Sequence, residues 1–291
     1  MTGHVTAPAA ALADQLPSWA ALCRAPNPGP MTLDGTNTWV LGVPGAGGVV
    51  VVDPGPLDEG HLAAVVALGP VAGVLLTHGH PDHAEGLARF LELSGAPRLL
   101  AEPGVAAVDA AGLRLRRLDT PGHTADSVCF LVEAAGERAV CTGDTILGRG
   151  TTVVAYPDGD LGDYLDSLAA LAGYEGIPAL PGHGPALADC AVAARFYLAH
   201  RRARLDQVRQ AVADGATTAA AVVQRVYADV DRSLWPAAEW SVRAQLAYLD
   251  DHTPRRAGSR PPEPEARKPG PGGPDPENRE SGPGAGGLDL A

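Results

Sequence analysis

Lysine is almost absent from this chain of 291 residues: Lys268 is the only one, and arginine supplies the other basic side chains. A phosphate-binding loop of the GxxxxGK[ST] type needs a lysine, so the rest of the sequence cannot contain one. No G-x-S-x-G segment occurs either, which excludes the serine nucleophile elbow of α/β-hydrolases. The sequence therefore offers neither a nucleoside-triphosphate loop nor this type of serine nucleophile.

Cysteine and aromatic residues are also scarce. The four cysteines form no CxxC pair and no disulfide-like density, and Cys129 and Cys141 lie in apolar runs that are typical of buried strands. Aromatic residues make up 4% of the chain, whereas apolar residues make up 45%. We therefore expect a sizeable core built from valine, leucine and alanine.

The sequence has no long hydrophobic segment. No apolar run approaches the roughly 20 residues of a membrane helix, and the N-terminus shows no basic region followed by an apolar one. We expect a cytoplasmic protein with no membrane partner, which argues against a secreted antibiotic-resistance enzyme. The pattern gives no indication of the oligomeric state.

Histidine and aspartate are concentrated in the segment THGHPDH at 77–83. The apolar run before it, 71–76, predicts a buried strand. His78 and His80 are two residues apart and can face the same point in extended chain, and Asp82 and His83 then project toward a neighbouring point. Imidazole and carboxylate groups suit zinc, and also iron or manganese. Taken alone, the segment could also be a polar loop without a metal.

Three further residues of the same kind follow along the chain. His123, Asp144 and His183 each lie beside a glycine where a strand is expected to end. Glycine lets the backbone approach a site closely and adopt positive φ. The five histidines and two aspartates can fill two adjacent sites that share one carboxylate. This set predicts a metal centre.

The order HxHxDH, His, Asp, His resembles the metallo-β-lactamase-fold hydrolase superfamily over residues from about 30 to 185. Two segments, NPGPMTLDGTNT at 27–38 and GDTILGRGTT at 143–152, are further similar to the β-lactamase-like protein 2 group. Members of that group carry a C-terminal winged-helix-like domain, and its animal members are described as single-strand endoribonucleases. The resemblance implies an α/β (α+β) fold, an αββα sandwich followed by a winged-helix-like helical domain.

The resemblance also implies roles for the seven residues. His78, His80 and His123 would hold one metal, Asp82, His83 and His183 a second, and Asp144 would bridge the two. Two Zn²⁺ ions are expected, although iron or manganese also suits these ligands. A hydroxide held between the ions would be the nucleophile, and Asp82 would act catalytically by orienting it and passing on its proton.

The pattern along the chain divides it into three parts. Residues 1–188 are expected to form the catalytic domain, 189–250 a helical domain, and 251–291 a disordered tail rich in proline and glycine. A winged helix normally finishes with a β-hairpin where this tail begins, which leaves the completeness of that domain open. Strands are expected at 38–41, 48–52, 71–76, 98–101, 113–118, 127–132 and 139–142, and helices at 58–68, 84–93, 161–171, 191–213, 217–227 and 235–250.

Charge bears on the substrate. The chain has 22 basic against 34 acidic residues and a formal net charge of −12, whereas polynucleotide binding depends on neutralising phosphates. We therefore favour hydrolysis of an ester, thioester, lactone or amide in a small molecule. A single-strand-specific endoribonuclease, with RNA as partner, is the first alternative. An iron-dependent oxygenase like the persulfide dioxygenases is the second, and a noncatalytic binding protein is disfavoured by the intact ligand set.

Three secondary features have two interpretations each. Asp53 either orients a metal ligand or ends a strand in a turn. Arg149 and Tyr156 either contact an anionic substrate or lie in a solvated loop. The arginine run on the expected long helix is a solvated face by default, with nucleic-acid contact as the alternative. This run consists of Arg195, Arg201, Arg202, Arg204 and Arg209, together with His200.

Overall fold

The computed structural model describes residues 16–101 and 105–252 of the chain. Of the predicted tail at 251–291, only residues 251 and 252 are described, and the rest lies outside the described residues. In the part of the chain that is described, no helix is both long enough and apolar enough to cross a membrane.

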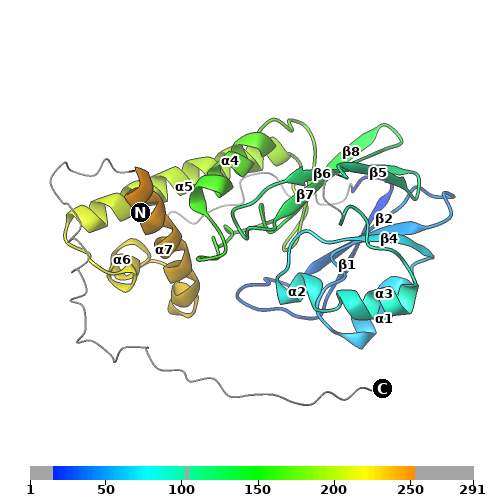
Figure 1. The fold of residues 1–291 in the computed structure, drawn as a ribbon, viewed down its shortest axis with the longest axis horizontal. Helices are drawn as coiled ribbons and strands as arrows, with labels where there is room; N and C mark the ends of the chain where they lie inside the picture. Colours follow the sequence, from blue (N-terminus) through cyan, green and yellow to red (C-terminus); the bar gives the residue numbers. More distant parts are fainter. Residues whose placement is uncertain (1–15, 102–104, 253–291) are drawn as a thin grey trace, which may run out of the picture. The chain divides into compact units, whose positions relative to one another are not determined.

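Two β-sheets form the centre of the fold (Figure 1). The first has four strands in sequence order, namely β1 (Ala20–Arg24), β2 (Asn37–Leu41), β3 (Val49–Val52) and β4 (Val71–Leu75). Its first two pairings are antiparallel. The last pairing, between β3 and β4, is parallel, because helix α1 (Glu59–Val66) carries the chain back to the same edge.

The second sheet repeats this arrangement with five strands. They are β5 (Ala107–Ala110), β6 (Leu113–Asp119), β7 (Val128–Ala134), β8 (Glu137–Gly143) and β9 (Ala179–Pro181), again in sequence order. Three antiparallel pairings are followed by a parallel one between β8 and β9, with helix α4 (Leu161–Leu171) in the connection.

Three apolar clusters hold these layers together. One joins the two sheets and includes Trp39 from β2 and Phe130 from β7. A second joins the first sheet to α1 and to α3 (Leu87–Ser94), whose Phe90 is fully buried. The third joins the second sheet to α4 and the start of α5 (Cys190–Ala213). The resulting order of helices, sheet, sheet and helices is the predicted αββα sandwich (Figure 1).

The predicted elements and the structure differ in a few places. Residues 98–101 do not form a strand, and the segment makes only an isolated bridge between Arg98 and Val74. Leu100 has a φ of 51°, which ends the extended conformation directly after this bridge. The short strands β1 and β5 were not predicted, whereas β9 is the strand that was expected to end beside His183. The predicted helix at 84–93 is in fact α2 (Pro81–Ala84) followed by α3.

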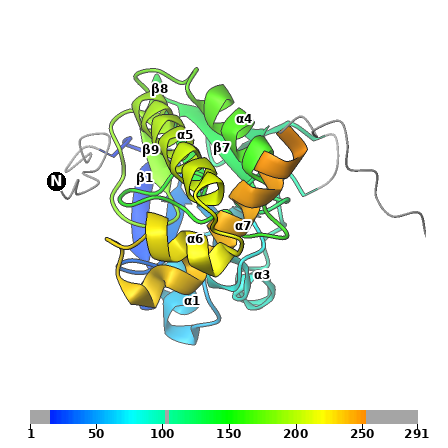
Figure 2. The same cartoon turned by 90° about the vertical axis from the view of Figure 1, so that its left-hand side faces the viewer.

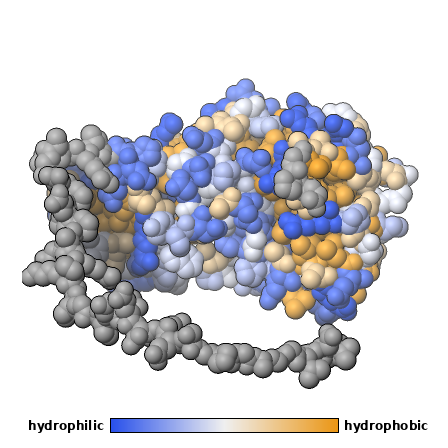
Figure 3. Space-filling view, in the orientation of Figure 1, coloured by the Kyte–Doolittle hydropathy of each residue, from blue (hydrophilic) through white to orange (hydrophobic). Residues whose placement is uncertain are grey.

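Helices make up the whole C-terminal part of the described chain. Helix α5 is followed by α6 (Ala219–Val226), a 3₁₀ turn (Arg232–Leu234) and α7 (Trp235–His252), which pack against one another (Figure 2). No strand lies between residues 190 and 252 of the described chain. The face shown in Figure 3 is mostly hydrophilic over this helical end and more hydrophobic over the two sheets. The predicted division at 188/189 coincides with the start of α5, and it stays a prediction.

Candidate metal centre

The seven predicted site residues come together at one edge of the sandwich. Each group follows the carboxyl end of a strand: His78 follows β4, His123 follows β6, Asp144 follows β8 and His183 follows β9. Asp82 and His83 lie in the first turn of α2. Strand ends that meet at one edge thus bring residues 78 and 183 into one cluster.

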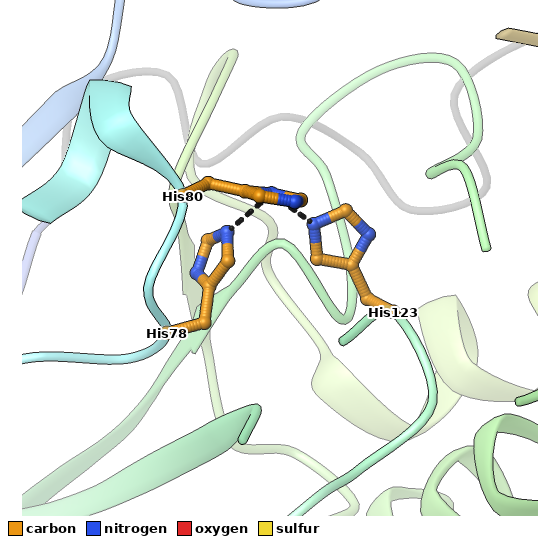
Figure 4. A group of neighbouring side chains, drawn as sticks. All are labelled: His78, His80 and His123. Carbon is orange, nitrogen blue, oxygen red and sulfur yellow. Dashed lines mark hydrogen bonds between the residues drawn. The ribbon is translucent and has the colours of Figure 1, made fainter. Parts of the chain in front are cut away.

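The first group consists of His78, His80 and His123, whose rings surround a common point (Figure 4). His80 Nδ1 lies 3.1 Å from His78 Nε2 and 3.0 Å from His123 Nε2. A neutral imidazole nitrogen carries one proton or one lone pair, so His80 Nδ1 donates to at most one of these neighbours. Hydrogen bonds among the rings therefore cannot satisfy all three nitrogens, whereas one cation accepts a lone pair from each.

The second group consists of Asp82, His83 and His183. Asp82 Oδ2 lies 3.3 Å from His83 Nε2 and 3.1 Å from His183 Nε2. The two Nε2 atoms are 3.3 Å apart. Thr36 donates its hydroxyl proton to the same Asp82 oxygen across 3.1 Å.

Asp144 lies between the two groups. Its Oδ2 is 3.8 Å from His123 Nε2 and 3.4 Å from His183 Nε2, and its Oδ1 is 3.4 Å from His83 Nε2. The Oδ1 atom is buried and accepts no hydrogen bond from the described residues. A buried carboxylate oxygen without a partner is costly, and a bound cation would remove that cost.

The far nitrogens of these histidines contact groups that fix the rings. His83 Nδ1 donates to Asp53 Oδ2 at 2.8 Å, and His123 Nδ1 donates to the Val153 carbonyl at 2.6 Å. His78 Nδ1 lies 3.0 Å from the Thr77 hydroxyl. Because the far nitrogen is engaged in each case, Nε2 is the atom that each of these rings presents to the centre.

Asp53 orients a predicted ligand, which resolves the two interpretations of this residue. It is 2% exposed, and besides contacting His83 it accepts hydrogen bonds from the Thr77 backbone N–H at 2.8 Å and the Thr77 hydroxyl at 2.7 Å. Its φ of 54° also places it at a sharp turn. Both interpretations therefore describe part of its role. The part played by Thr77 was not predicted, although it directly precedes the histidine motif.

The segment GTN at 35–37 joins the His183 loop to the first sheet. Asn37 donates through its side-chain amide to the carbonyls of Pro181 at 3.0 Å and Gly184 at 2.8 Å. Its backbone N–H donates to the Gly182 carbonyl at 2.7 Å. These contacts fix the loop that carries His183.

Glycine is required at two points of the centre. A Cβ on Gly182 would lie 2.5 Å from Asp144 Oδ1 and 2.7 Å from His83 Cε1. Gly143 has a φ of 48°, and a Cβ there would lie 2.6 Å from the Thr77 hydroxyl oxygen. The predicted reason for the glycines beside the ligands is thus correct at both positions.

Burial lowers the pKa of His78 and of His123, and neighbouring imidazoles oppose protonation further. Both rings are therefore neutral at physiological pH and have a free lone pair. This is the protonation state that a metal ligand needs.

The second group is dominated by its carboxylates. Burial is the largest single influence and opposes a charge on His83 and His183, but the surrounding carboxylates together outweigh it. Asp144 and Asp53 raise the pKa of His83 well above its usual range, and Asp144 and Asp82 raise that of His183 to about 9. Burial likewise opposes ionisation of Asp144 and Asp82, yet the two histidines hold the pKa of both carboxyl groups well below the usual range. The negative potential that attracts these protons would equally favour a metal cation.

The donor set therefore fits metal ions. It offers imidazole nitrogens and carboxylate oxygens in two groups, with an unsatisfied oxygen between them. The structure brings all seven predicted residues together, and their assignment as ligands remains a proposal.

A cavity of about 390 Å³ opens beside the centre. His123 and Asp144 line it, as do apolar side chains that include Leu147 and Val230. Arg149 also lines it, but this side chain pairs with Asp34 through both of its terminal nitrogens. Tyr156 is 39% exposed and is not part of the lining.

The arginine run does not behave as one solvated face. Arg195 pairs with Glu175 and Arg209 with Asp206 at the surface, and Arg202 is exposed. Arg201 is only 3% exposed, and it lines the cavity together with Arg204 and His200. The default interpretation is therefore wrong for Arg201, because α5 turns this side chain toward the loop after Asp144.

Comparison with known proteins agrees with this geometry. Residues 31–107 match the metallo-β-lactamase superfamily. A β-lactamase-like protein 2 homologue of Caenorhabditis elegans is 32% identical over 250 residues, which cover 77% of this chain and 78% of that protein. The chain belongs to the metallo-β-lactamase superfamily. Residues 218–251 also match the β-lactamase-associated winged helix domain.

Two further relatives of this superfamily member extend the comparison. An atrochrysone carboxyl ACP thioesterase of Passalora fulva is 32% identical over 66% of this chain. The chain spans 61% of that protein, and between 58% and 62% of several fungal lactamase-like proteins. The crystal structure of a metallo-β-lactamase family protein from Thermus thermophilus has a TM-score of 0.63 and 27% identity, covering 80% of this chain and 93% of that one.

Proposed function

We propose that this chain is a metal-dependent hydrolase that cleaves an ester or thioester of a small acyl group at a binuclear, zinc-type centre. The single observation that carries this proposal is Asp144, whose two oxygens lie between two groups of three ligand-type side chains. The thioesterase name of the Passalora fulva relative favours a thioester over a lactone or amide.

In this proposal His78, His80 and His123 hold one ion, Asp82, His83 and His183 hold the other, and Asp144 contacts both. Bound metal would polarise the acyl carbonyl of the substrate and lower the pKa of the attacking water. Asp82 Oδ2 accepts from Thr36 and lies beside the Nε2 atoms of His83 and His183, so this oxygen would face the ion. Asp82 Oδ1 would then orient the attacking water and accept its proton.

The reaction balances without a nucleophilic side chain. The water oxygen forms the new bond to the acyl carbon, and the C–S or C–O bond breaks with its electron pair on the leaving atom. One water proton passes through Asp82 to the leaving thiolate or alkoxide. The second proton is released when the product acid ionises.

The cavity supports a small substrate over a polymer. A volume of about 390 Å³ lies within the usual range of small-molecule sites, on the order of 300–1,000 Å³. The net charge of −12 disfavours a long polyanion. A short acyl chain would contact the apolar part of the lining.

The test is a hydrolysis screen over ester, thioester, lactone, β-lactam and single-stranded RNA substrates, with metal content measured on the same sample. Asp144→Ala should lose most of the activity and lower the metal stoichiometry, while circular dichroism stays unchanged. Asp166→Ala, at an exposed position on α4, is the matched control and should behave as the native chain.

Three outcomes would count against the proposal. Full activity in a metal-poor Asp144→Ala protein would exclude the binuclear mechanism. Cleavage of single-stranded RNA alone would identify an endoribonuclease. Iron in protein grown without metal supplements, together with oxygen uptake on a persulfide, would identify an oxygenase.

A further inference from the structure

The cavity beside the metal centre has an unusual balance of charge. Three arginines line it in a protein of net charge −12, whereas its only lining carboxylate among the described residues is Asp144 of the metal centre. Arg149 is neutralised by Asp34. No carboxylate of the described residues lies within ion-pairing distance of the other two, Arg201 and Arg204.

Arg201 is the more unusual of the two. Its side chain is 3% exposed, it donates to the Thr152 carbonyl, and its guanidinium carbon lies 5.3 Å from the centre of the Tyr164 ring. Its Nε is buried and has no hydrogen-bond partner among the described residues. Arginine cannot lose its proton in a protein, so this is a buried cation without a counter-ion. Such a group is costly unless an anion pairs with it.

Arg204 lies one turn along α5 on the same side of the helix. It is half-buried, lies 4.4 Å from the centre of the Tyr227 ring and donates to the Val226 carbonyl. His200 lies beside both arginines, and burial together with their charges lowers its pKa to about 4. His200 is therefore neutral at physiological pH and leaves the positive potential to the arginines.

We propose that the cavity binds an acyl group whose far end carries a carboxylate, and that Arg201 and Arg204 pair with this carboxylate. The inference rests on the proposed hydrolase function and names its substrate class: a thioester or ester of a short dicarboxylic acid. The scissile carbonyl lies at the His123 and Asp144 side of the cavity, and the apolar lining contacts the methylene chain between its two ends.

A pair of substrates that differ only in this charge tests the proposal. The S-glutaryl thioester of N-acetylcysteamine has a free carboxylate, and its methyl ester has the same chain without the charge. In the metal-loaded native protein, kcat/KM should be about 10- to 100-fold higher for the acid, as expected for a charge-assisted hydrogen bond. Arg204→Met should reduce this ratio about tenfold or more, and Arg201→Met should reduce it further.

Arg202→Met is the matched control, because Arg202 is an exposed arginine on the same helix. It should leave the ratio unchanged. A second readout is independent of turnover: glutarate should bind the metal-loaded native protein and Arg202→Met equally, and Arg204→Met more weakly, in isothermal titration. If Arg201→Met does not fold, Arg204→Met still decides the question.

The outcomes separate the two proposals. Equal cleavage of acid and methyl ester, with glutarate affinity unchanged in Arg204→Met, would overturn the carboxylate site while the hydrolase function stands. Glutarate binding that depends on Arg204, without cleavage of any ester or thioester, would support the site and overturn the hydrolase function. Cleavage of single-stranded RNA that is lost in Arg204→Met would show that the anion is a phosphate and overturn the inference.

Discussion

The contact between Asp53 and His83 is open to a sharp test, the substitution Asp53→Asn. The carboxylate accepts from His83 and the Thr77 hydroxyl through Oδ2, and from the Thr77 backbone N–H through Oδ1. Donors face both carboxylate oxygens, whereas an asparagine has one acceptor oxygen and one NH₂ group. The NH₂ group must therefore face either His83 or Thr77, where it meets another donor. The backbone itself is not disturbed, because asparagine tolerates the φ of 54° at this position.

Either orientation of the amide weakens the centre. If the NH₂ group faces His83, Nδ1 must accept a hydrogen bond instead of donating one. The ring proton then lies on Nε2, which no longer has a lone pair for a metal ion. If the NH₂ group faces the Thr77 backbone, the turn before His78 is displaced. Loss of such an orienting contact costs on the order of 10- to 100-fold in metal affinity, or about 1.4 to 2.7 kcal/mol.

The assay is competition between the protein and a chromophoric zinc chelator, which gives the dissociation constants of both sites. The dissociation constant of the second site, to which His83 belongs, should rise about 10- to 100-fold in Asp53→Asn, and the circular dichroism spectrum should stay unchanged. Asp58→Asn is the control, because Asp58 lies in the same connection but caps α1, a role that asparagine fills equally well. Native zinc affinity in Asp53→Asn would refute the orienting role.

Three other perturbations have defined outcomes. Gly182→Ala should lower metal content and reduce the free energy of unfolding by about 1–3 kcal/mol, because its Cβ would overlap Asp144 and His83; urea denaturation and metal analysis measure both. Tyr197→Phe should reduce the free energy of unfolding by about 1–3 kcal/mol in the same urea assay, because the buried Leu147 N–H loses the hydroxyl that accepts from it. An unchanged free energy of unfolding would contradict this. Because the unfolded chain binds a proton at His200 near pH 6.5 and the folded chain only near pH 4, native stability should fall through this window as pH decreases. His200→Gln should lose less stability between pH 7 and pH 5, and equal losses would exclude the effect.

The residues that cluster around Asp144 could be named from sequence because their signals are local. The spacing of His78 and His80 after an apolar strand, and a glycine beside each later residue, need no knowledge of distant contacts. The positions of Arg201 and Arg204 in the cavity could not be predicted in this way. The burial of Arg201 depends on Tyr164 and Thr152, which lie far away in sequence, and a run of arginines on a helix is usually solvated. The strands β1 and β5 contain no fully buried residue, so no buried apolar run marks them in the sequence, and pairing with β2 and β6 defines them.

The loop at 152–154 ties the helical end of the molecule to a predicted metal ligand. Val153 receives the His123 N–H, while its neighbours are held by Arg201 of α5 and Ser241 of α7, the latter accepting from the Val154 N–H. A truncation at residue 188 would keep the residues of both sheets and all seven predicted ligand side chains. It would remove the contacts of this loop with Arg201 and Ser241. The predicted boundary at 188/189 is therefore a poor place to truncate the chain, because α5 and α7 both hold the loop that contacts His123.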